Sequence, residues 1–154
     1  MSEYSYRKNV AAIIVNENGQ MFIAARSDFP DYWQLLQGGI EPHETPTEAL
    51  KRELNEEIGV THYEVIAQAP HTIKYTWPKH LWRDGHCGQE QHYFLVRIHT
   101  STPIDLDNHE EKEFVAFQWI DAHEYLKHPL DFKKEAYHQA IRYFLENHGH
   151  AFKK

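Results

Sequence analysis

The hydrophobic residues near the N-terminus fall into two short runs separated by a turn. Residues 10–15 read VAAIIV and residues 21–25 read MFIAA, with NENG at 16–19 between them. Short apolar runs bounded by asparagine and glycine are typical of β-strands joined by a tight turn. This pattern predicts a β-hairpin whose first strand is buried.

A third apolar segment, WQLLQ at 33–37, follows the polar segment DFPDY at 28–32. We expect a loop and then a short strand. Gly38 and Gly39 are expected to end that strand, because glycine adopts backbone angles that other residues avoid.

Strand-like patterns return in the second half of the chain. Residues 71–77 (HTIKYTW), 91–99 (QHYFLVRIH) and 117–120 (FQWI) alternate between apolar and polar positions or run apolar. We expect the polar segment with Asp84, Gly85 and Gly88 to be a loop between the first two of these strands.

One helix is predicted from its own end signals. Thr45 suits the N-cap, Pro46 the first helical position, and Glu48 the third, which completes a capping box. Gly59 suits a left-handed C-terminal residue. An apolar stripe at four-residue spacing lies between these ends, at Leu50, Leu54 and Ile58.

A second amphipathic helix is predicted over residues 134–146, with apolar residues at helical spacing at Tyr137, Ala140, Ile141 and Phe144. Strands mixed with two helices favour an α/β or α+β sandwich. The length of 154 residues and the 41% hydrophobic content suit one domain, residues 1–154.

Composition excludes several classes of protein. The net charge of -7 argues against a protein that coats nucleic acid, so we expect no DNA partner. No apolar stretch is long enough for a membrane span, and the first ten residues lack the apolar run of a signal peptide, which favours a cytoplasmic location. Cys87 is the only cysteine, and the thirteen histidines show no zinc-ligand spacing.

Three carboxylates share one side of the first predicted helix. Glu53, Glu56 and Glu57 stand at i, i+3 and i+4, which places their side chains within roughly 5–6 Å of one another. Such a string alone is more often a solvated acidic face. Alternatively, a hard divalent cation with oxygen ligands offsets the repulsion.

The surrounding sequence favours the second interpretation. Residues 38–60, GGIEPHETPTEALKRELNEEIGV, resemble the Nudix box at each of its defining positions. The resemblance implies an αβα sandwich with a mixed β-sheet, in which the box forms a loop-helix-loop. It also implies a phosphoanhydride hydrolase that uses Mg²⁺, with Mn²⁺ as a substitute, held by Glu53, Glu56, Glu57 and the backbone of Gly38.

The same resemblance assigns roles to other residues. Glu44, Arg52 and Gly59 are expected to be structural within the box, with Arg52 near a carboxylate at Glu48 or Glu56. Catalysis is assigned to the carboxylates Glu53, Glu56, Glu57 and Glu113. The group that takes the proton of the attacking water is left open among Glu56, Glu57 and Glu113, the last of which follows the acidic segment after Asn108 and matches a further metal ligand.

Beyond the box, four segments are similar to bacterial RNA pyrophosphohydrolases and dinucleoside polyphosphate hydrolases: YRKNV, WQLLQGG, GQEQHYFL and DFKKEAY. This similarity implies phosphate contacts from Arg7 and Arg26. It places Gln37 and Gln89 near the site, and Phe132 and Lys133 at the base and backbone of RNA. Two residues depart from the pattern, because Lys8 and Leu36 stand where these relatives have proline.

We therefore expect Mg²⁺-dependent conversion of 5′-triphosphate RNA ends to monophosphates, in support of mRNA decay. Hydrolysis of diadenosine polyphosphates or nucleoside triphosphates is the alternative, because the metal and polyphosphate chemistry is shared. A noncatalytic nucleotide-binding Nudix module is a more remote alternative. The oligomeric state is left open.

Overall fold

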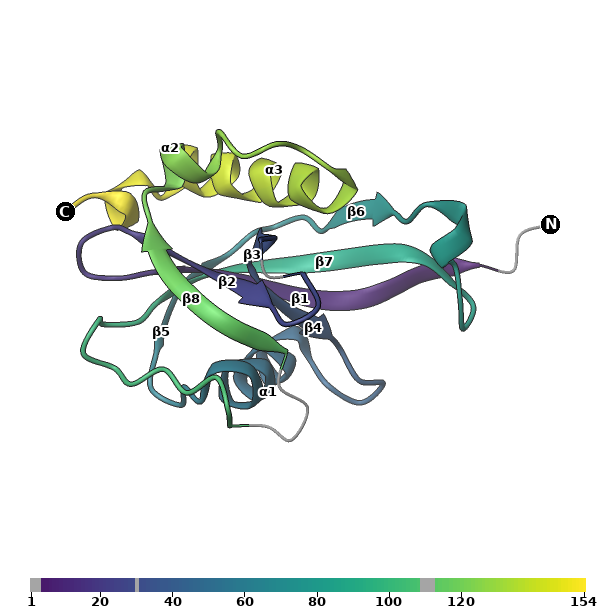
Figure 1. Cartoon of the computed structure of the whole chain (residues 1–154), viewed down its shortest axis with the longest axis horizontal. Helices are drawn as coiled ribbons and strands as arrows, with labels where there is room; N and C mark the ends of the chain where they lie inside the picture. The colour runs from purple at the N-terminus through teal and green to yellow at the C-terminus, as the bar shows by residue number, and fades with distance from the viewer. Residues whose placement is uncertain (1–3, 30, 109–112) are drawn as a thin grey trace.

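The computed structural model describes residues 4–29, 31–108 and 113–154, so Pro30 and part of the acidic segment before Glu113 lie outside the described residues. A mixed sheet of eight strands lies between two layers of helices (Figure 1). The strands are β1 Ser5–Val15, β2 Met21–Arg26, β3 Trp33–Gln34, β4 Leu36–Gly39, β5 Glu64–Gln68, β6 Ile73–Thr76, β7 His86–Arg97 and β8 Phe114–Ile120. The helices are α1 Pro46–Ile58, α2 Ala122–Tyr125 and α3 Phe132–Asn147, with short 3-10 turns at Lys79–Leu81 and Gly149–Phe152.

The sheet is organised around β1. This strand pairs in parallel with β7 along its whole length, from Ser5 to Val15, and antiparallel with β2 and β4. β8 extends the sheet from β2, whereas β5 and β6 both pair with β7. The mixture of parallel and antiparallel pairs confirms the predicted fold class.

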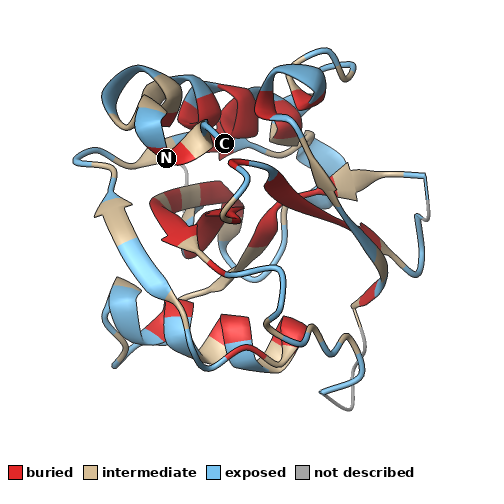
Figure 2. Ribbon diagram, turned by 90° about the vertical axis from the view of Figure 1, so that its left-hand side faces the viewer, coloured by how far each residue is buried: buried red, intermediate tan, exposed pale blue. Residues whose placement is uncertain are grey.

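The two faces of the sheet bury separate cores. Successive side chains of a strand point to opposite faces, so Val10, Ala12 and Ile14 pack with α1 while Ala11, Ile13 and Val15 pack with α3. This explains why VAAIIV is apolar throughout instead of alternating, since a strand covered on both faces reads as a continuous apolar run. Buried residues accordingly concentrate in the sheet and on the inward sides of both helix layers (Figure 2).

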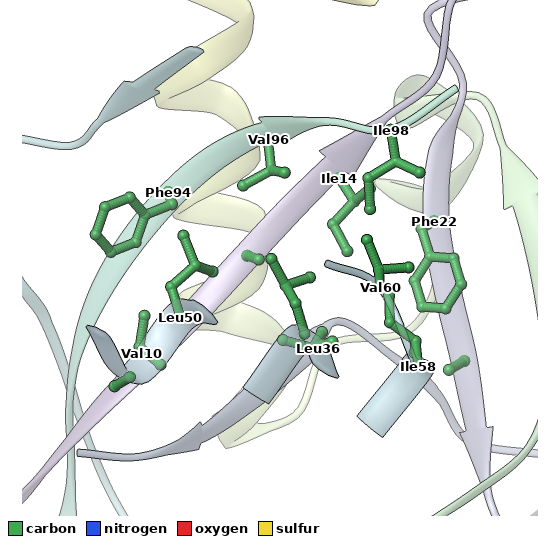
Figure 3. Packing of buried hydrophobic residues seen from close by; sticks show 14 of the residues in the cluster. Val10, Ile14, Phe22, Leu36, Leu50, Ile58, Val60, Phe94, Val96 and Ile98 are labelled. Carbon is green, nitrogen blue, oxygen red and sulfur yellow. The ribbon is translucent and has the colours of Figure 1, made fainter. Parts of the chain in front are cut away.

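The core under α1 fixes the helix that carries the acidic residues. Leu50, Leu54 and Ile58 are fully buried, as the predicted stripe requires. Figure 3 shows Leu50 near Val10 of β1 and Phe94 of β7, and Ile58 near Val60 and Phe22 of β2. One face of α1 is thereby held on the sheet, which sets the orientation of its remaining side chains.

The ends of α1 are those predicted. The Thr45 hydroxyl accepts a hydrogen bond from the Glu48 backbone at 3.2 Å, and the Glu48 carboxylate accepts one from the Thr45 backbone at 2.9 Å. Gly59 ends the helix in the left-handed region, with φ of 66°. The capping box and the glycine terminator are both confirmed.

β4 ends at Gly39, as the glycine pair predicted, but the two glycines do not interrupt the strand before that point. Both belong to β4, where Gly38 pairs with Val10 and Gly39 with Asn9. The predicted strand 33–37 is instead divided at Leu35, because β3 pairs with β2 and β4 pairs with β1. The glycines serve close approach rather than a turn: a Cβ at Gly38 would overlap the Glu53 carboxylate, and one at Gly39 the Arg7 guanidinium.

Other boundaries also differ from the prediction. Gly88 lies in β7 and not in a loop, because the missing Cβ admits the backbone carbonyl of Tyr75 from β6. The final helix begins at Phe132, two residues earlier than predicted, since Asp131 caps it by accepting hydrogen bonds from the backbones of Lys133 and Lys134. β5 and α2 were not predicted. None of the helices in the described residues is long and apolar enough to cross a membrane.

Replacing Thr45 by alanine should lower the free energy of unfolding by about 1 kcal/mol, because it leaves a backbone N–H of the first turn without its acceptor. In a chain of this size, that corresponds to a fall in Tm of roughly 2–4 °C. Thr47→Ala is the matched control, as Thr47 is exposed on the same turn and alanine favours helix. Equal losses for the two variants in thermal unfolding would show that the cap contributes nothing specific.

Candidate active site

Helix α1 presents three carboxylates to one side of the molecule. Glu53, Glu56 and Glu57 each offer an oxygen within 4.8 Å of the others. Glu53 and Glu57 are only 6% and 8% exposed, whereas Glu56 is half-buried. The spacing read from the sequence therefore does produce a compact group of oxygens, and most of that group is withdrawn from water.

Arg52 ties this group to the loop that precedes the helix. Its guanidinium donates hydrogen bonds of 2.7 and 2.8 Å to the two carboxylate oxygens of Glu44, and one of 2.8 Å to the carbonyl of Gly39. It also donates to Glu53 at 2.8 Å and to Glu56 at 3.3 Å. The bonds from Arg52 lower the pKa of Glu44 to about 2.

The expected neighbours of Arg52 are partly corrected by these contacts. Glu56 is one of its partners, but the Glu48 carboxylate is engaged in the capping box instead. Glu44, eight residues away in sequence, holds Arg52 most closely. Helical spacing alone does not reveal this pair, because Glu44 lies before the helix begins.

Glu113 reaches the same group from the other side. Its carboxylate lies 3.9 Å from the guanidinium of Arg26, which in turn contacts Asp28 at 3.0 Å. Glu113 also hydrogen-bonds to Glu57 and raises the pKa of that residue. Three carboxylates from α1 and one from the residue before β8 thus share one small region.

Burial and mutual repulsion raise the pKa of the two innermost carboxyls. Burial is the main cause for Glu53, whose pKa rises to about 7 even though Arg52 opposes the shift. For Glu57, burial comes first and the charge of Glu113 second, and the pKa rises to about 8. Burial and like charges disfavour the ionised form of a carboxylate.

These observations fit a divalent metal ion. Several buried carboxylate oxygens within a few ångströms, each costly to ionise without a cation, are the ligand type that hard divalent cations prefer. Gly38 lies beside them because its missing Cβ leaves room for the Glu53 carboxylate. Glu53, Glu56 and Glu57 are the residues that would hold the ion, with Glu113 and the Gly38 backbone close enough to the cleft to contribute.

The carboxylates form one wall of a cleft of about 480 Å³. Every residue predicted to bind metal or substrate lines this cleft, although the residues come from distant parts of the chain: Arg7, Arg26, Gln37, Gly38, Glu53, Glu56, Glu57, Gln89, Glu113, Phe132 and Lys133. The structural residues Glu44, Arg52 and Gly59 lie outside it. The residues that the sequence analysis singled out for metal or substrate binding therefore lie together in one cleft.

Cationic and aromatic side chains face the carboxylates. Phe132 begins α3 and remains 37% exposed, with its ring 6.0 Å from that of Tyr75. Lys133 is half-buried, and burial followed by the charge of Arg26 lowers its pKa. Arg7 is exposed on β1 and makes no ion pair with a described residue.

A buried polar network supports the floor of the cleft. The amide of Gln37 donates to the Tyr137 hydroxyl at 2.9 Å, and its oxygen accepts from Gln91 at 2.6 Å. Gln91 also donates to Asn9 at 3.0 Å and accepts from Tyr93 at 2.6 Å. Gln37 is therefore held between the sheet and α3, which also carries Phe132 and Lys133.

Sequence reasoning missed six residues of the cleft: Asn9, Gly39, Tyr75, Trp77, Leu81 and Arg83. Tyr75 and Trp77 are two positions apart, so strand alternation would place them on one face. Leu81 and Arg83 belong to the connection between β6 and β7, and no local pattern signals that this connection folds over the cleft.

Leu36 and Lys8, which depart from the pattern of the relatives, take ordinary strand positions. Leu36 is fully buried in the core under α1 and pairs with Ala12, while Lys8 pairs with Glu90 across β1 and β7. Neither residue lines the cleft. The departures therefore place no side chain in the cleft.

A NUDIX domain model matches residues 5–143. This chain belongs to the Nudix family. Curated relatives include RNA pyrophosphohydrolases of Helicobacter pylori, 44% identical, and of a Nitratiruptor species, 41% identical, each over 94% of this chain and 96% of the relative. An Ap4A hydrolase complex from C. elegans shares the fold, with a TM-score of 0.70 at 17% identity, covering 93% of this chain and 98% of that one.

Membership in the Nudix family confirms the fold and the interpretation of residues 38–60 as a Nudix box. A divalent cation is common to Nudix hydrolases, and the acidic group on α1 supplies ligands for one. The identities extend well beyond the box, since both relatives align over nearly the whole chain.

The raised pKa values predict how pH affects the metal-free protein. A carboxyl whose pKa rises on folding stabilises the folded state below its unfolded pKa, near 4.5, and this stabilisation is lost as pH rises toward 7–8. Glu57→Gln removes the free-energy cost of an ionised Glu57 in the folded, metal-free protein. It should therefore raise the Tm of chelator-treated protein at pH 8 by roughly 2–4 °C for each kcal/mol of that cost, with little effect at pH 5. Added divalent cation should give the wild type the higher Tm of the two proteins, because the cation stabilises only the wild type.

Thermal unfolding across pH 5–9 checks this expectation. Glu64→Gln serves as the control, because Glu64 is exposed on β5 and does not line the cleft. A Tm difference between Glu57→Gln and wild type that does not vary with pH would show that Glu57 is not held at a raised pKa.

Proposed function

We propose that this chain hydrolyses the 5′-triphosphate end of RNA to a monophosphate, releasing pyrophosphate or successive phosphates, with Mg²⁺ as its cofactor and Mn²⁺ as a substitute. The observation that carries the proposal is the composition of the cleft. A carboxylate group suited to a cation faces arginine, lysine and an exposed aromatic ring in one cleft. The names of the curated relatives from Helicobacter pylori and Nitratiruptor support the choice of RNA.

The metal ligands in this proposal are Glu53, Glu56 and Glu57, with Glu113 and the Gly38 carbonyl completing the set. When bound, the cation supplies charge neutralisation at the phosphate oxygens and acidifies the attacking water. Arg52 keeps the ligands in register by bonding to Glu53 and Glu56 while anchored on Glu44. Gly59 ends the helix that carries them.

One carboxylate must also take the proton of the attacking water. Glu56 and Glu113 are the more accessible groups, with side chains 33% and 41% exposed. Glu57 is more buried, and it lies against Glu113. We assign the role to one of these three residues.

The remaining cleft residues are proposed to bind the substrate. The guanidinium groups of Arg7 and Arg26 suit phosphate oxygens because they present forked donors, and Lys133 adds a further cation. The exposed ring of Phe132 suits stacking on an unpaired base. Gln37 and Gln89 belong to the same lining.

Purified protein with Mg²⁺ should convert 5′-triphosphorylated oligoribonucleotides to monophosphorylated ones and release phosphate products. Diadenosine polyphosphates and nucleoside triphosphates, assayed in parallel, represent the alternative substrates with the same metal chemistry. Activity confined to diadenosine polyphosphates would contradict the RNA assignment while retaining the hydrolase.

Glu56→Gln should lower kcat on every substrate by a factor of about 100 or more, on the order of losses seen when one catalytic or metal-binding group is removed. Glu64→Gln, outside the cleft, should leave kcat unchanged. Retained activity in Glu56→Gln, with an unaltered Tm, would remove Glu56 from both proposed roles. A fold that binds nucleotides without catalysis would show no turnover in the wild type either.

Phe132→Ala should weaken RNA turnover more than nucleoside triphosphate turnover. Base stacking on an aromatic ring contributes about 1–3 kcal/mol, so we expect kcat/KM for RNA to fall roughly 5- to 100-fold. Phe29→Ala is the matched control, since Phe29 is 64% exposed and does not line the cleft. Equal changes for the two variants would contradict a stacking role for Phe132.

A further inference from the structure

The connection between β6 and β7, residues 77–85, forms an arm that borders the cleft through Trp77, Leu81 and Arg83. Asp84 and Gly85 turn the chain with φ of 53° and 79°, and backbone hydrogen bonds of 2.8 and 3.1 Å join Arg83 to His86. The Trp82 indole donates to the Trp77 carbonyl at 2.9 Å. These contacts fix the backbone that carries Arg83.

A hollow of about 400 Å³ lies beneath this arm, lined by Arg7, Trp77, Arg83, Asp84, His86 and Gln89. Four of these residues, namely Arg7, Trp77, Arg83 and Gln89, also line the catalytic cleft. The arm hollow therefore opens directly from the cleft. Phe132 belongs to a different edge, because it borders a separate hollow between β6 and α3.

Two polar atoms in the arm hollow have no hydrogen-bond partner among the described residues. One is Oε1 of Gln89, a side chain only 8% exposed, and the other is Nδ1 of His86. Buried polar atoms of this kind are normally hydrogen-bonded, and a carboxamide oxygen can only accept. Gln89 and His86 both line the hollow, so an unsatisfied carboxamide oxygen lies in its wall, just beneath the accessible surface.

The guanidinium groups of the hollow are also free to bind. Neither Arg7 nor Arg83 forms an ion pair with any carboxylate in the described part of the chain, although Asp84 lies in the same lining. The third arginine of the cleft, Arg26, contacts both Asp28 and Glu113. Unpaired positive charge is therefore concentrated at the arm.

We propose that the arm hollow binds a downstream nucleotide of a single-stranded RNA, separate from the one at Phe132; this inference rests on the proposed function. Arg83 contacts the phosphodiester, Trp77 stacks on the base, and Gln89 Oε1 accepts from a ribose 2′-hydroxyl or a base N–H. The 2′-hydroxyl is a donor that RNA provides and DNA lacks.

The unpaired arginines favour a continuing strand over the second nucleoside of a dinucleoside polyphosphate. Beyond its phosphate bridge, a dinucleoside polyphosphate ends in an uncharged nucleoside, which leaves Arg83 without an anion. An RNA strand carries a further phosphodiester at every step, and each such contact adds salt-dependent affinity.

Arg83→Ala tests this subsite with substrates of two lengths. We expect kcat/KM for a 5′-triphosphorylated tetranucleotide to fall about tenfold, which is the effect of losing one charge-assisted contact. The fall for a nucleoside triphosphate should be roughly five times smaller, about twofold. The salt dependence of tetranucleotide binding should fall by about 0.7 in log-log slope. Lys79→Ala removes a charge from the same arm outside both hollows and should match wild type.

Equal losses on both substrate lengths, or equal effects of Arg83→Ala and Lys79→Ala, would overturn the arm proposal while leaving RNA hydrolysis by the wild type intact. Wild-type protein inactive on all triphosphorylated RNA would instead overturn the proposed function. In that event, the affinity for a labelled 5′-monophosphorylated tetranucleotide, measured by fluorescence anisotropy, tests the arm subsite separately. Equal affinities of wild type and Arg83→Ala would reject the subsite.

Discussion

The repulsion among carboxylates held on one buried helix face is the constraint on which the site depends. Leu50, Leu54 and Ile58 anchor α1 to the sheet, and Glu53 and Glu57 flank this apolar stripe one turn along the helix, so both carboxylates stay buried. Arg52 offsets part of the charge and is itself held by Glu44. What remains is an acidic group that is costly to ionise alone and is stabilised by a divalent cation.

The sheet brings the rest of the cleft to this group. β1 supplies Arg7, β4 supplies Gln37 and Gly38, and β7 supplies Gln89, because these strands are direct neighbours. Because Gly38 and Gly39 have no side chains, the Glu53 carboxylate and the Arg7 guanidinium can lie close to the strand. The same packing that stabilises the fold therefore sets the distance between the carboxylates and the cations that face them.

Short sequence patterns predicted the features of α1 that depend on neighbouring residues alone, namely its two ends and the spacing of its acidic side chains. The capping box at Thr45, the terminator at Gly59 and the acidic spacing on α1 each lie within a few residues, and each was confirmed as structure. Contacts across the chain were beyond such signals, including the pairing of Glu44 with Arg52 and the placement of Arg83 over the cleft. The close approach at Gly38 and Gly39 was not predicted, because it involves side chains far away in sequence, which a turn rule cannot represent. The cationic and aromatic residues of the cleft were found through resemblance to relatives, since an isolated arginine or phenylalanine carries no local signal.

The most direct test of this account is a crystal structure of the protein grown with Mn²⁺ and a nucleotide polyphosphate, with anomalous scattering used to locate the metal. The account predicts an anomalous peak bounded by the carboxylates of Glu53, Glu56 and Glu57, with phosphate oxygens on its open side. An ordered polyphosphate in the cleft without metal at these carboxylates, or metal bound only elsewhere, would contradict it.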